Sequence, residues 1–192
     1  MDSALVSATL QGALLSMTSN VMAQVISSYK HDTPFSLSLA PIIKFAAFSI
    51  ISNPPNIVWQ NYLEGLYPTS VQALPAKTES PKSNPALSKQ ATSYTNVMIK
   101  FALDQTFGAV VNTLMFLVYM GYMNSSPTGK NNPLNSIVNE IQEKFYPMIM
   151  GGMKLWPVFS IVSFLWIPVE KRVVAGCMVG VVWGIYLSLL VE

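Results

Sequence analysis

The chain has 192 residues, of which 51% are hydrophobic and only 10% are charged, against roughly 25% charged residues in ordinary soluble domains. This length suits a single domain over residues 1–192, and the formal net charge of +2 is too small to indicate nucleic-acid binding. The lone cysteine, Cys177, excludes an intrachain disulfide framework and a thiolate metal cluster. The composition therefore predicts an integral membrane protein.

The first predicted helix, residues 3–29, contains no charged residue. On a helix its small and polar residues gather on one side and its aliphatic residues on the other, which is typical of a membrane span with one lipid-facing side. The polar side consists of Gly12, Ser16, Ser19, Asn20, Gln24 and Ser27, and the apolar side of Leu10, Leu14, Met17, Val21 and Val25. No cleavable address is predicted, because Asp2 replaces the positive start of a secretory signal and the first basic residue is Lys30.

A second apolar segment, residues 35–52, has Lys44 near its middle. Pro54 and Pro55 follow it and are expected to kink or break the helix, because proline lacks the amide donor. Beyond them, residues 57–66 carry aromatic side chains of the kind that settle at the membrane–water boundary. Trp59 and Tyr62 lie within this segment, and Tyr67 directly follows it. We expect a kinked second span.

Residues 68–93 are rich in Pro, Ser, Thr and Lys. Such a segment has little to bury, so we expect an exposed linker that offers a site for a protein partner.

The third span is predicted over residues 95–123. Lys100 and Asp104 lie four residues apart on one helical face, which predicts an ion pair. Residues 134–145 then show apolar side chains at helical spacing, which favours an amphipathic helix on the membrane surface.

A fourth apolar segment covers residues 146–167 and is interrupted by Lys154 and Pro157. The last, residues 173–191, is uncharged and close to the roughly 20 residues that span a bilayer as a helix. The sequence thus predicts an all-α integral membrane bundle with four to five transmembrane helices. For five crossings, the loop charges favour a cytosolic amino terminus.

Charged and amide side chains inside the apolar segments are candidates for a polar path through the bundle, or for hydrogen bonds between helices. They are Asn20, Gln24, Lys44, Lys100, Asp104, Gln105, Asn112, Lys154 and Arg172. Arg172 begins the last helix, where the positive end of the helix dipole disfavours a cation. We therefore expect an acidic or carbonyl partner for it, and Asp104 is the predicted partner.

The carboxyl-terminal half also carries an ordered set of landmark residues. Further landmarks lie upstream of it: Gly12, Asn20, Gln24, Pro55, Trp59, Asp104 and Gln105. The landmarks of the carboxyl-terminal half are Tyr146, Trp156, Pro157, Phe164, Pro168, Arg172, Trp183, Tyr186, Leu187 and Ser188. In this order they resemble the signature of the Mpv / twenty-two-kilodalton peroxisomal membrane protein family. The usual amino-terminal helix of that family is missing, and the linker looks longer than typical.

The resemblance implies an organelle membrane protein that forms or regulates a pore for small solutes. Asn20, where the mitochondrial branch has Asp, favours the peroxisomal membrane over the mitochondrial inner membrane. An adaptor that organises peroxisome-derived or mitochondrial membranes is the alternative, and the linker at 68–93 is its expected partner site. The other expected partner is the lipid bilayer. Association of the chain with copies of itself is left open by the sequence.

An enzyme is not expected. The only histidine, His31, lies in a polar turn without metal-ligand spacing, and no phosphate loop or nucleophile motif appears. No cofactor or metal site is predicted.

Overall fold

The computed structural model describes residues 3–72, 90–125 and 132–190; the side chains of 4, 71, 72, 90 and 186–190 are not described. This part of the chain is helical except for two short strands. The elements are α1 (Ser3–Lys30), α2 (Leu39–Leu66), β1 (Ser70–Gln72), β2 (Gln90–Thr92), α3 (Tyr94–Leu103), the π-helix η2 (Asp104–Gly108), α4 (Ala109–Asn124), α5 (Pro133–Gly152), α6 (Trp156–Trp166) and α7 (Val169–Leu190).

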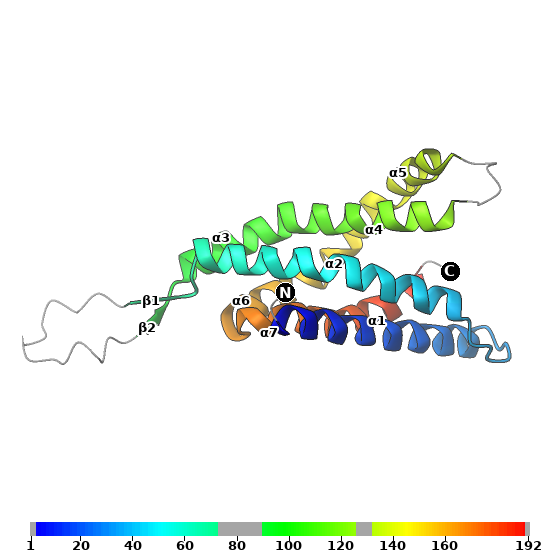
Figure 1. Cartoon of the computed structure of the whole chain (residues 1–192), viewed down its shortest axis with the longest axis horizontal. Coiled ribbons are helices and arrows are strands. Elements are labelled where there is room, and N and C mark those ends of the chain that lie inside the picture. The colour runs from blue at the N-terminus through cyan, green and yellow to red at the C-terminus, as the bar shows by residue number, and fades with distance from the viewer. Residues whose placement is uncertain (1–2, 73–89, 126–131, 191–192) are drawn as a thin grey trace, which may run out of the picture.

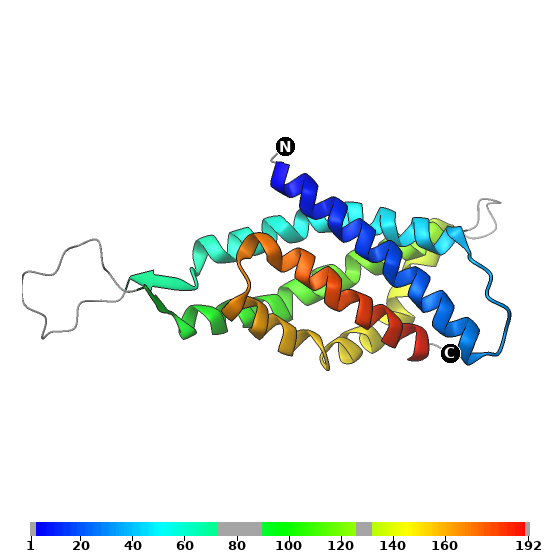
Figure 2. The same ribbon diagram turned by 90° about the horizontal axis from the view of Figure 1, so that it is seen from below.

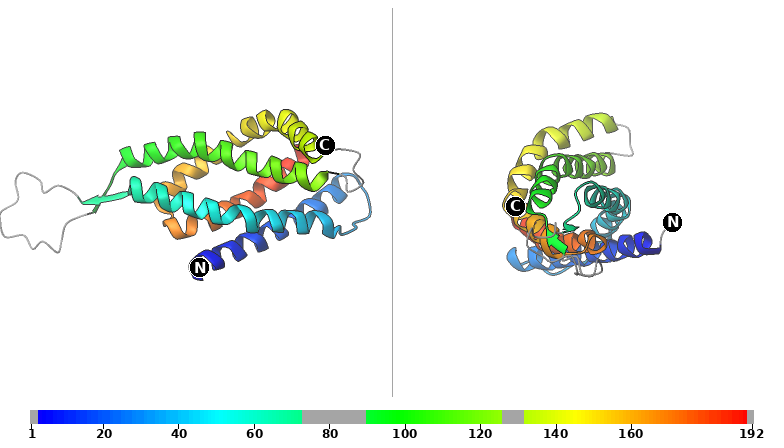
Figure 3. Two further views of the ribbon diagram at one scale, coloured as in Figure 1. Left: turned by 45° about the horizontal axis from the view of Figure 1, so that its top comes forward. Right: turned by 90° about the vertical axis from the view of Figure 1, so that its left-hand side faces the viewer.

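The chain runs back and forth along one long axis (Figure 1). The turns after α1 and α4 lie at one end, and the β-ribbon and the α6–α7 turn lie at the other (Figures 1 and 2). Helix α1 packs on α2 and α7, α3 packs on α6, and α4 packs on α5. Seen along the axis, α5 and α1 lie at opposite edges of the molecule (Figure 3, right).

Helix α1 confirms the division predicted from its sequence. Leu10, Leu14, Met17 and Val25 are exposed, as expected of a lipid-facing side. On the opposite side, the Ser16 hydroxyl donates to the Phe45 carbonyl of α2 at 3.1 Å. The small and polar side of α1 is therefore used to pack against other helices.

Of the kink or break expected at Pro54 and Pro55, the break does not occur. Helix α2 continues through Pro54 and Pro55, although each proline removes an intrahelical donor. The Asn56 amide donates to the Ser52 carbonyl at 3.0 Å, which adds a side-chain hydrogen bond across the proline pair.

The two ends of the predicted linker pair with each other. Strands β1 and β2 form an antiparallel ribbon in which Ser70 faces Thr92 and Gln72 faces Gln90. The Ser93 amide also donates to the Thr69 carbonyl at 2.9 Å. Backbone hydrogen bonds therefore hold the two ends of the linker together. Residues 73–89 of the predicted partner site lie outside the described residues.

The third span forms as expected but contains a feature that the sequence analysis missed. Between α3 and α4, η2 has π-helical geometry, and the Ala109 amide donates to the Asp104 carbonyl five residues before it. A π-bulge inserts an extra residue into the helix and turns the side chains that follow it. Asp104, the first residue of η2, forms hydrogen bonds with α2 and α6.

The surface helix and the fourth apolar segment are divided differently from the prediction. Helix α5 runs from Pro133 through Pro147 to Gly152, so it joins the amphipathic stretch to the start of the apolar one. The break falls at the turn before α6, and the two helices are bent by 54°. Asn132 caps α5 by accepting a hydrogen bond from the Leu134 amide at 3.1 Å.

Among the described residues, one helix is long and apolar enough to cross a membrane, Tyr94–Asn124. The bent pair α5 and α6 would be a second span if it crosses as one unit. The four to five crossings predicted from the sequence are therefore not confirmed. The predicted run 173–191 extends past the described side chains.

Candidate functional site

The inward face of α2 is polar along much of its length. Its polar residues recur at intervals of three or four positions, which places them on one helical face, and they are buried or half-buried. They are Ser49, Ser52, Asn53, Asn56, Gln60 and Glu64. At three successive positions along α2, which we call levels, this face contacts polar groups from other helices. These three levels form the candidate site.

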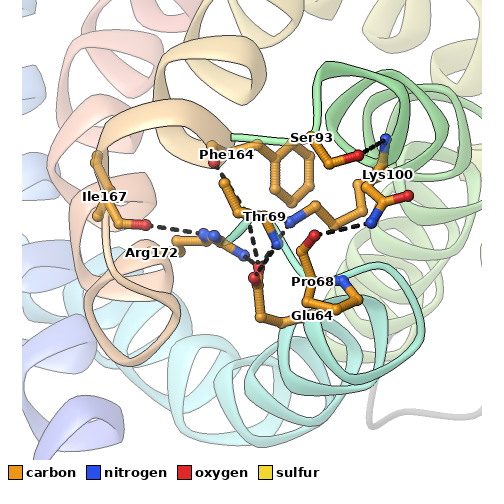
Figure 4. Close-up of polar contacts among 9 residues, drawn as sticks. Glu64, Pro68, Thr69, Ser93, Lys100, Phe164, Ile167 and Arg172 are labelled. Atoms are coloured by element: carbon orange, nitrogen blue, oxygen red, sulfur yellow. Dashed lines mark hydrogen bonds and ion pairs between the residues drawn. The ribbon is translucent and has the colours of Figure 1, made fainter. Parts of the chain in front are cut away.

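The first level is an ion cluster at the end of α2 (Figure 4). One oxygen of Glu64, Oε2, lies 2.7 Å from the Lys100 ammonium of α3 and 2.7 Å from the Arg172 guanidinium of α7. Lys100 is fully buried and Arg172 is 5% exposed. Burying two cations is costly unless they are paired, so this single carboxylate is central to the fold.

Further groups complete the cluster. The Thr69 amide donates to Glu64 Oε1 at 2.7 Å, and Arg172 Nε donates to the Ile167 carbonyl at 3.0 Å. The Phe164 ring lies 5.2 Å from Lys100 Nζ and 5.0 Å from Arg172 Cζ, close enough for cation–π attraction. The cluster has two positive charges and one negative charge, so it carries a net +1.

Two ion pairs predicted from the sequence are therefore wrong. Lys100 and Arg172 both pair with Glu64, and neither pairs with Asp104. The helical spacing of Lys100 and Asp104 allows a contact, but a better-placed carboxylate on α2 takes both cations. The general expectation that Arg172 needs an acidic or carbonyl partner agrees with its contacts to Glu64 and Ile167.

The second level surrounds Asp104. Its Oδ1 accepts hydrogen bonds from Trp59 Nε1 at 3.3 Å and Gln60 Nε2 at 3.1 Å. Its Oδ2 accepts from the Ser160 hydroxyl at 2.9 Å and Gln105 Nε2 at 3.4 Å. Four neutral donors thus occupy the roughly four acceptor positions of an ionised carboxylate. Within the described residues, no lysine or arginine forms an ion pair with it.

The two levels are one helical turn apart on three helices at once. Gln60 precedes Glu64 on α2, Lys100 precedes Asp104 on α3 and η2, and Ser160 precedes Phe164 on α6, each by four residues. Four residues of α-helix rise about 6 Å. The charges of the interior are therefore layered, with the cations gathered at one level and the second carboxylate at the next.

The third level is an amide pair between α2 and α4. Asn56 and Asn112 each donate to the other's carbonyl oxygen, at 2.8 and 2.9 Å. Beside the pair, a groove of about 350 Å³ opens between the two helices. Its lining includes Trp59, Tyr62 and Phe107.

The remaining candidate residues lie elsewhere. Gln24 donates to Asn20 at 2.9 Å and also bonds the backbone of Ser38, so these residues fasten the turn after α1. Lys44 donates to Asn124 at 2.8 Å at the same end of the molecule. Lys154 is exposed in the turn between α5 and α6. The candidates form several separate clusters, and no contact joins them all.

The landmark residues mostly serve packing. Phe164 is buried in the ion cluster with Arg172, and Trp156 stacks edge-on with Trp183 at 6.4 Å between centroids. Pro157 starts α6, Pro168 precedes α7, and Tyr146 is exposed on α5. Tyr186, Leu187 and Ser188 continue the backbone of α7, and their side chains lie outside the described part.

Sequence reasoning missed Glu64, Gln60 and Ser160. A signal for Glu64 was present, because Glu64 and Asp104 are the only acidic residues inside the predicted second and third spans. Two buried cations need acidic partners, which makes Glu64 a candidate by elimination. Nothing in the sequence marks Ser160 among the many serines.

Comparison with known proteins places the chain in a family. A sequence model of the Mpv17 / PMP22 family matches residues 129–188. PXMP2/4 family protein 3 of Dictyostelium discoideum is 24% identical over 181 residues, which cover 94% of this chain and 80% of that protein. Protein sym1 of Schizosaccharomyces pombe is 23% identical over 79% of this chain and 61% of its own length.

A shorter similarity extends to Mitochondrial inner membrane protein Mpv17 of Drosophila melanogaster, which is 26% identical over 48% of this chain and 52% of its own length. No solved structure matches the chain. The matched region contains the turn and helices that hold Phe164 and Arg172. The chain is a member of the Mpv17 / PMP22 family.

Proposed function

We propose that this protein is a multi-pass organelle membrane protein that forms or regulates a pore for small solutes. The observation that carries the proposal is the reversed polarity of the fold. Buried positions include Lys100, Arg172 and Asn53, whereas many large aliphatic side chains are exposed. Soluble domains bury apolar side chains and almost never bury lysine fully. A membrane bundle has the opposite need, because lipid surrounds it.

The polar face of α2 is the proposed route. It places amide and carboxylate groups at successive turns, opposite polar groups of α3, η2, α4 and α6. These groups hydrogen-bond to one another across the bundle, as in the Asn56–Asn112 pair. The described arrangement therefore corresponds to a closed path, and opening it requires the amide pairs to separate.

Five passes through the membrane are part of the proposal. The long axis is traversed by α1, by α2, by α3 with η2 and α4, by α5 with α6, and by α7. Helices α1 and α2 are less apolar than a typical span, but their polar sides face other helices. The organelle is proposed to be the peroxisome, on the basis of Asn20, and imaging of a tagged chain with peroxisomal and mitochondrial markers tests this choice.

Reconstitution in planar bilayers tests the pore. The purified full chain should give discrete conductance steps, and Gln60→Leu should change them, because it removes an amide from the middle of the polar face. Gln11→Leu is the matched control, since Gln11 is exposed on α1 and its amide donates to Ser7 of the same helix. Its conductance should equal that of the wild type.

If the protein gives no conductance although a cooperative thermal transition verifies its folding, the proposal of a pore is wrong. Deletion of residues 73–89 then addresses the adaptor alternative. Loss of bound partner proteins after this deletion, in a chain without conductance, would assign the protein to membrane organisation.

A further inference from the structure

The groove between α2 and α4 has an aromatic wall. Trp59 lies 5.2 Å from Phe107 and 6.3 Å from Tyr62 between ring centroids, and all three rings line the groove. Tyr62 and Phe107 are each 57% exposed. The volume of about 350 Å³ falls in the range of roughly 300–1,000 Å³ that small-molecule sites occupy.

The carboxyl group of Asp104 lies directly behind this wall. Trp59 is a groove residue, and its indole N–H donates to Asp104 Oδ1. Such a bond to a carboxylate pushes electron density into the ring and strengthens its attraction for cations. The four groups that donate hydrogen bonds to Asp104 are all neutral.

Gly108 brings the carboxylate close to the groove. It lines the groove, and a Cβ added to it would lie 3.1 Å from Trp59 Nε1 and 3.2 Å from Asp104 Oδ1. Gly108 therefore has no side chain to cover the Trp59–Asp104 hydrogen bond. Lys100 and Arg172 of the Glu64 cluster do not line the groove.

We propose that the groove formed by Trp59, Tyr62, Phe107 and Gly108 binds a quaternary ammonium group of the choline type. Electron-rich aromatic rings backed by a carboxylate attract an alkylated cation, which is weakly hydrated and leaves water readily. An inorganic cation such as K⁺ is held less well, because the exposed lining offers few free oxygen ligands. The site does not depend on the proposed pore.

The position in the bundle fits either a free ammonium compound or a lipid headgroup. Asp104 lies ten residues after the start of α3, about 15 Å along the helix axis. The 20 residues that follow it, 105–124, carry no charge and are long enough to cross a roughly 30 Å hydrocarbon core. Asp104 therefore lies near the boundary of that core if these residues span it. Trp and Tyr are common at this boundary.

Binding of tetramethylammonium to the purified full chain tests the proposal. The protein is held in a detergent without a choline headgroup and titrated calorimetrically. Tetramethylammonium should bind, whereas 3,3-dimethylbutan-1-ol, whose neutral tert-butyl group has nearly the same shape, should not. Trp59→Leu should weaken binding about tenfold or more, and Asp104→Asn should weaken it about fivefold, as expected for a desolvated cation–π site and a nearby charge.

Trp166→Leu is the matched control, because Trp166 is 72% exposed on α6 and does not line the groove. Its affinity should be unchanged. Asp104→Asn keeps the size of the side chain, and its thermal transition shows whether the fold is retained. In nanodiscs, phosphatidylcholine that competes with tetramethylammonium identifies a lipid headgroup as the source, whereas no competition identifies a free compound.

Equal binding of the neutral alcohol, or undiminished binding by folded Trp59→Leu, would overturn the proposal. So would the absence of measurable heat with wild-type protein whose folding is verified. Unchanged affinity in folded Asp104→Asn would also contradict it, because the carboxylate would then contribute nothing.

Discussion

Glu64 is the residue on which the interior charges depend. It joins α2 to both α3 and α7 through a single carboxylate oxygen. Because the cluster carries a net +1, its three members are not equivalent. Removal of one cation leaves a balanced pair, whereas removal of the carboxylate leaves two buried cations facing each other.

We predict that Glu64→Gln is more destabilising than either Lys100→Met or Arg172→Met. Removing one partner of a buried pair costs roughly 3–5 kcal/mol, and the glutamine variant leaves two cations without that partner. Thermal unfolding in detergent measures the order of the three variants. A smaller loss for Glu64→Gln than for Lys100→Met would contradict the shared-carboxylate arrangement.

Gly12 is required at the crossing of α1 with α2 and α7. A Cβ added to it would lie 2.1 Å from Asn53 Nδ2 and 3.0 Å from Cys177 Sγ. Asn53 is 5% exposed, and its amide nitrogen has no partner. The glycine therefore makes room for a buried amide group that gains little from its own hydrogen bonds.

We predict that Gly12→Ala lowers stability by about 1–3 kcal/mol, the usual cost of overpacking. The double variant Gly12→Ala with Asn53→Ala should regain most of this loss, because the obstructing amide is removed. Gly180→Ala is the control: nothing lies within 4 Å of its added Cβ, so it should be neutral or slightly stabilising. A double variant no better than Gly12→Ala would assign the loss to another cause.

At the scale of elements, the crossing of α4 and α5 differs from that of α1 and α2. A Cβ on Gly121 would lie 2.6 Å from the Cα and 3.0 Å from the backbone nitrogen of Ile137. A backbone cannot move aside by changing a rotamer. We therefore expect Gly121→Ala to force α5 away from α4.

Gly121→Ala should lower the midpoint of thermal unfolding, and Ile137→Ala should not rescue it, because the obstructing atoms belong to the backbone. Gly65→Ala, with nothing within 4 Å of its added Cβ, is the control on α2. Limited proteolysis in the segment between α4 and α5 measures the separation. Rescue by Ile137→Ala would show instead that the side chain of Ile137, and not its backbone, obstructs the methyl group added at Gly121.

For the whole molecule, the sequence predicted the helical class and most helix positions because long apolar segments with few charges are typical of membrane-spanning helices. It failed where tertiary contacts override local signals. Pro54 and Pro55 suggest a kink or a break, but α2 continues through both prolines. The π-helix that begins at Asp104 was also not predicted from the sequence. Pairing by helical spacing selected Asp104, whereas the structure selects Glu64 from another helix.

The direction of the passes gives the last prediction. His31 follows α1 and Ser125 follows α4, so they lie at one end of the bundle, whereas Thr92 and Lys171 lie at the other. If α2 crosses the membrane, and the helices from α3 to α4 cross together, these two pairs of residues must face opposite compartments. The loop charges favour a cytosolic amino terminus, which puts Thr92 and Lys171 on the cytosolic side.

Single-cysteine variants in a Cys177→Ser background measure this directly with a membrane-impermeant maleimide, before and after permeabilisation of the organelle. His31→Cys and Ser125→Cys should react only after permeabilisation, and Thr92→Cys and Lys171→Cys should react before it. The reverse pattern keeps five passes and inverts the orientation. Reaction of all four before permeabilisation would mean that α2 and the helices from α3 to α4 lie on the membrane without crossing it, and the arrangement of five passes would then be wrong.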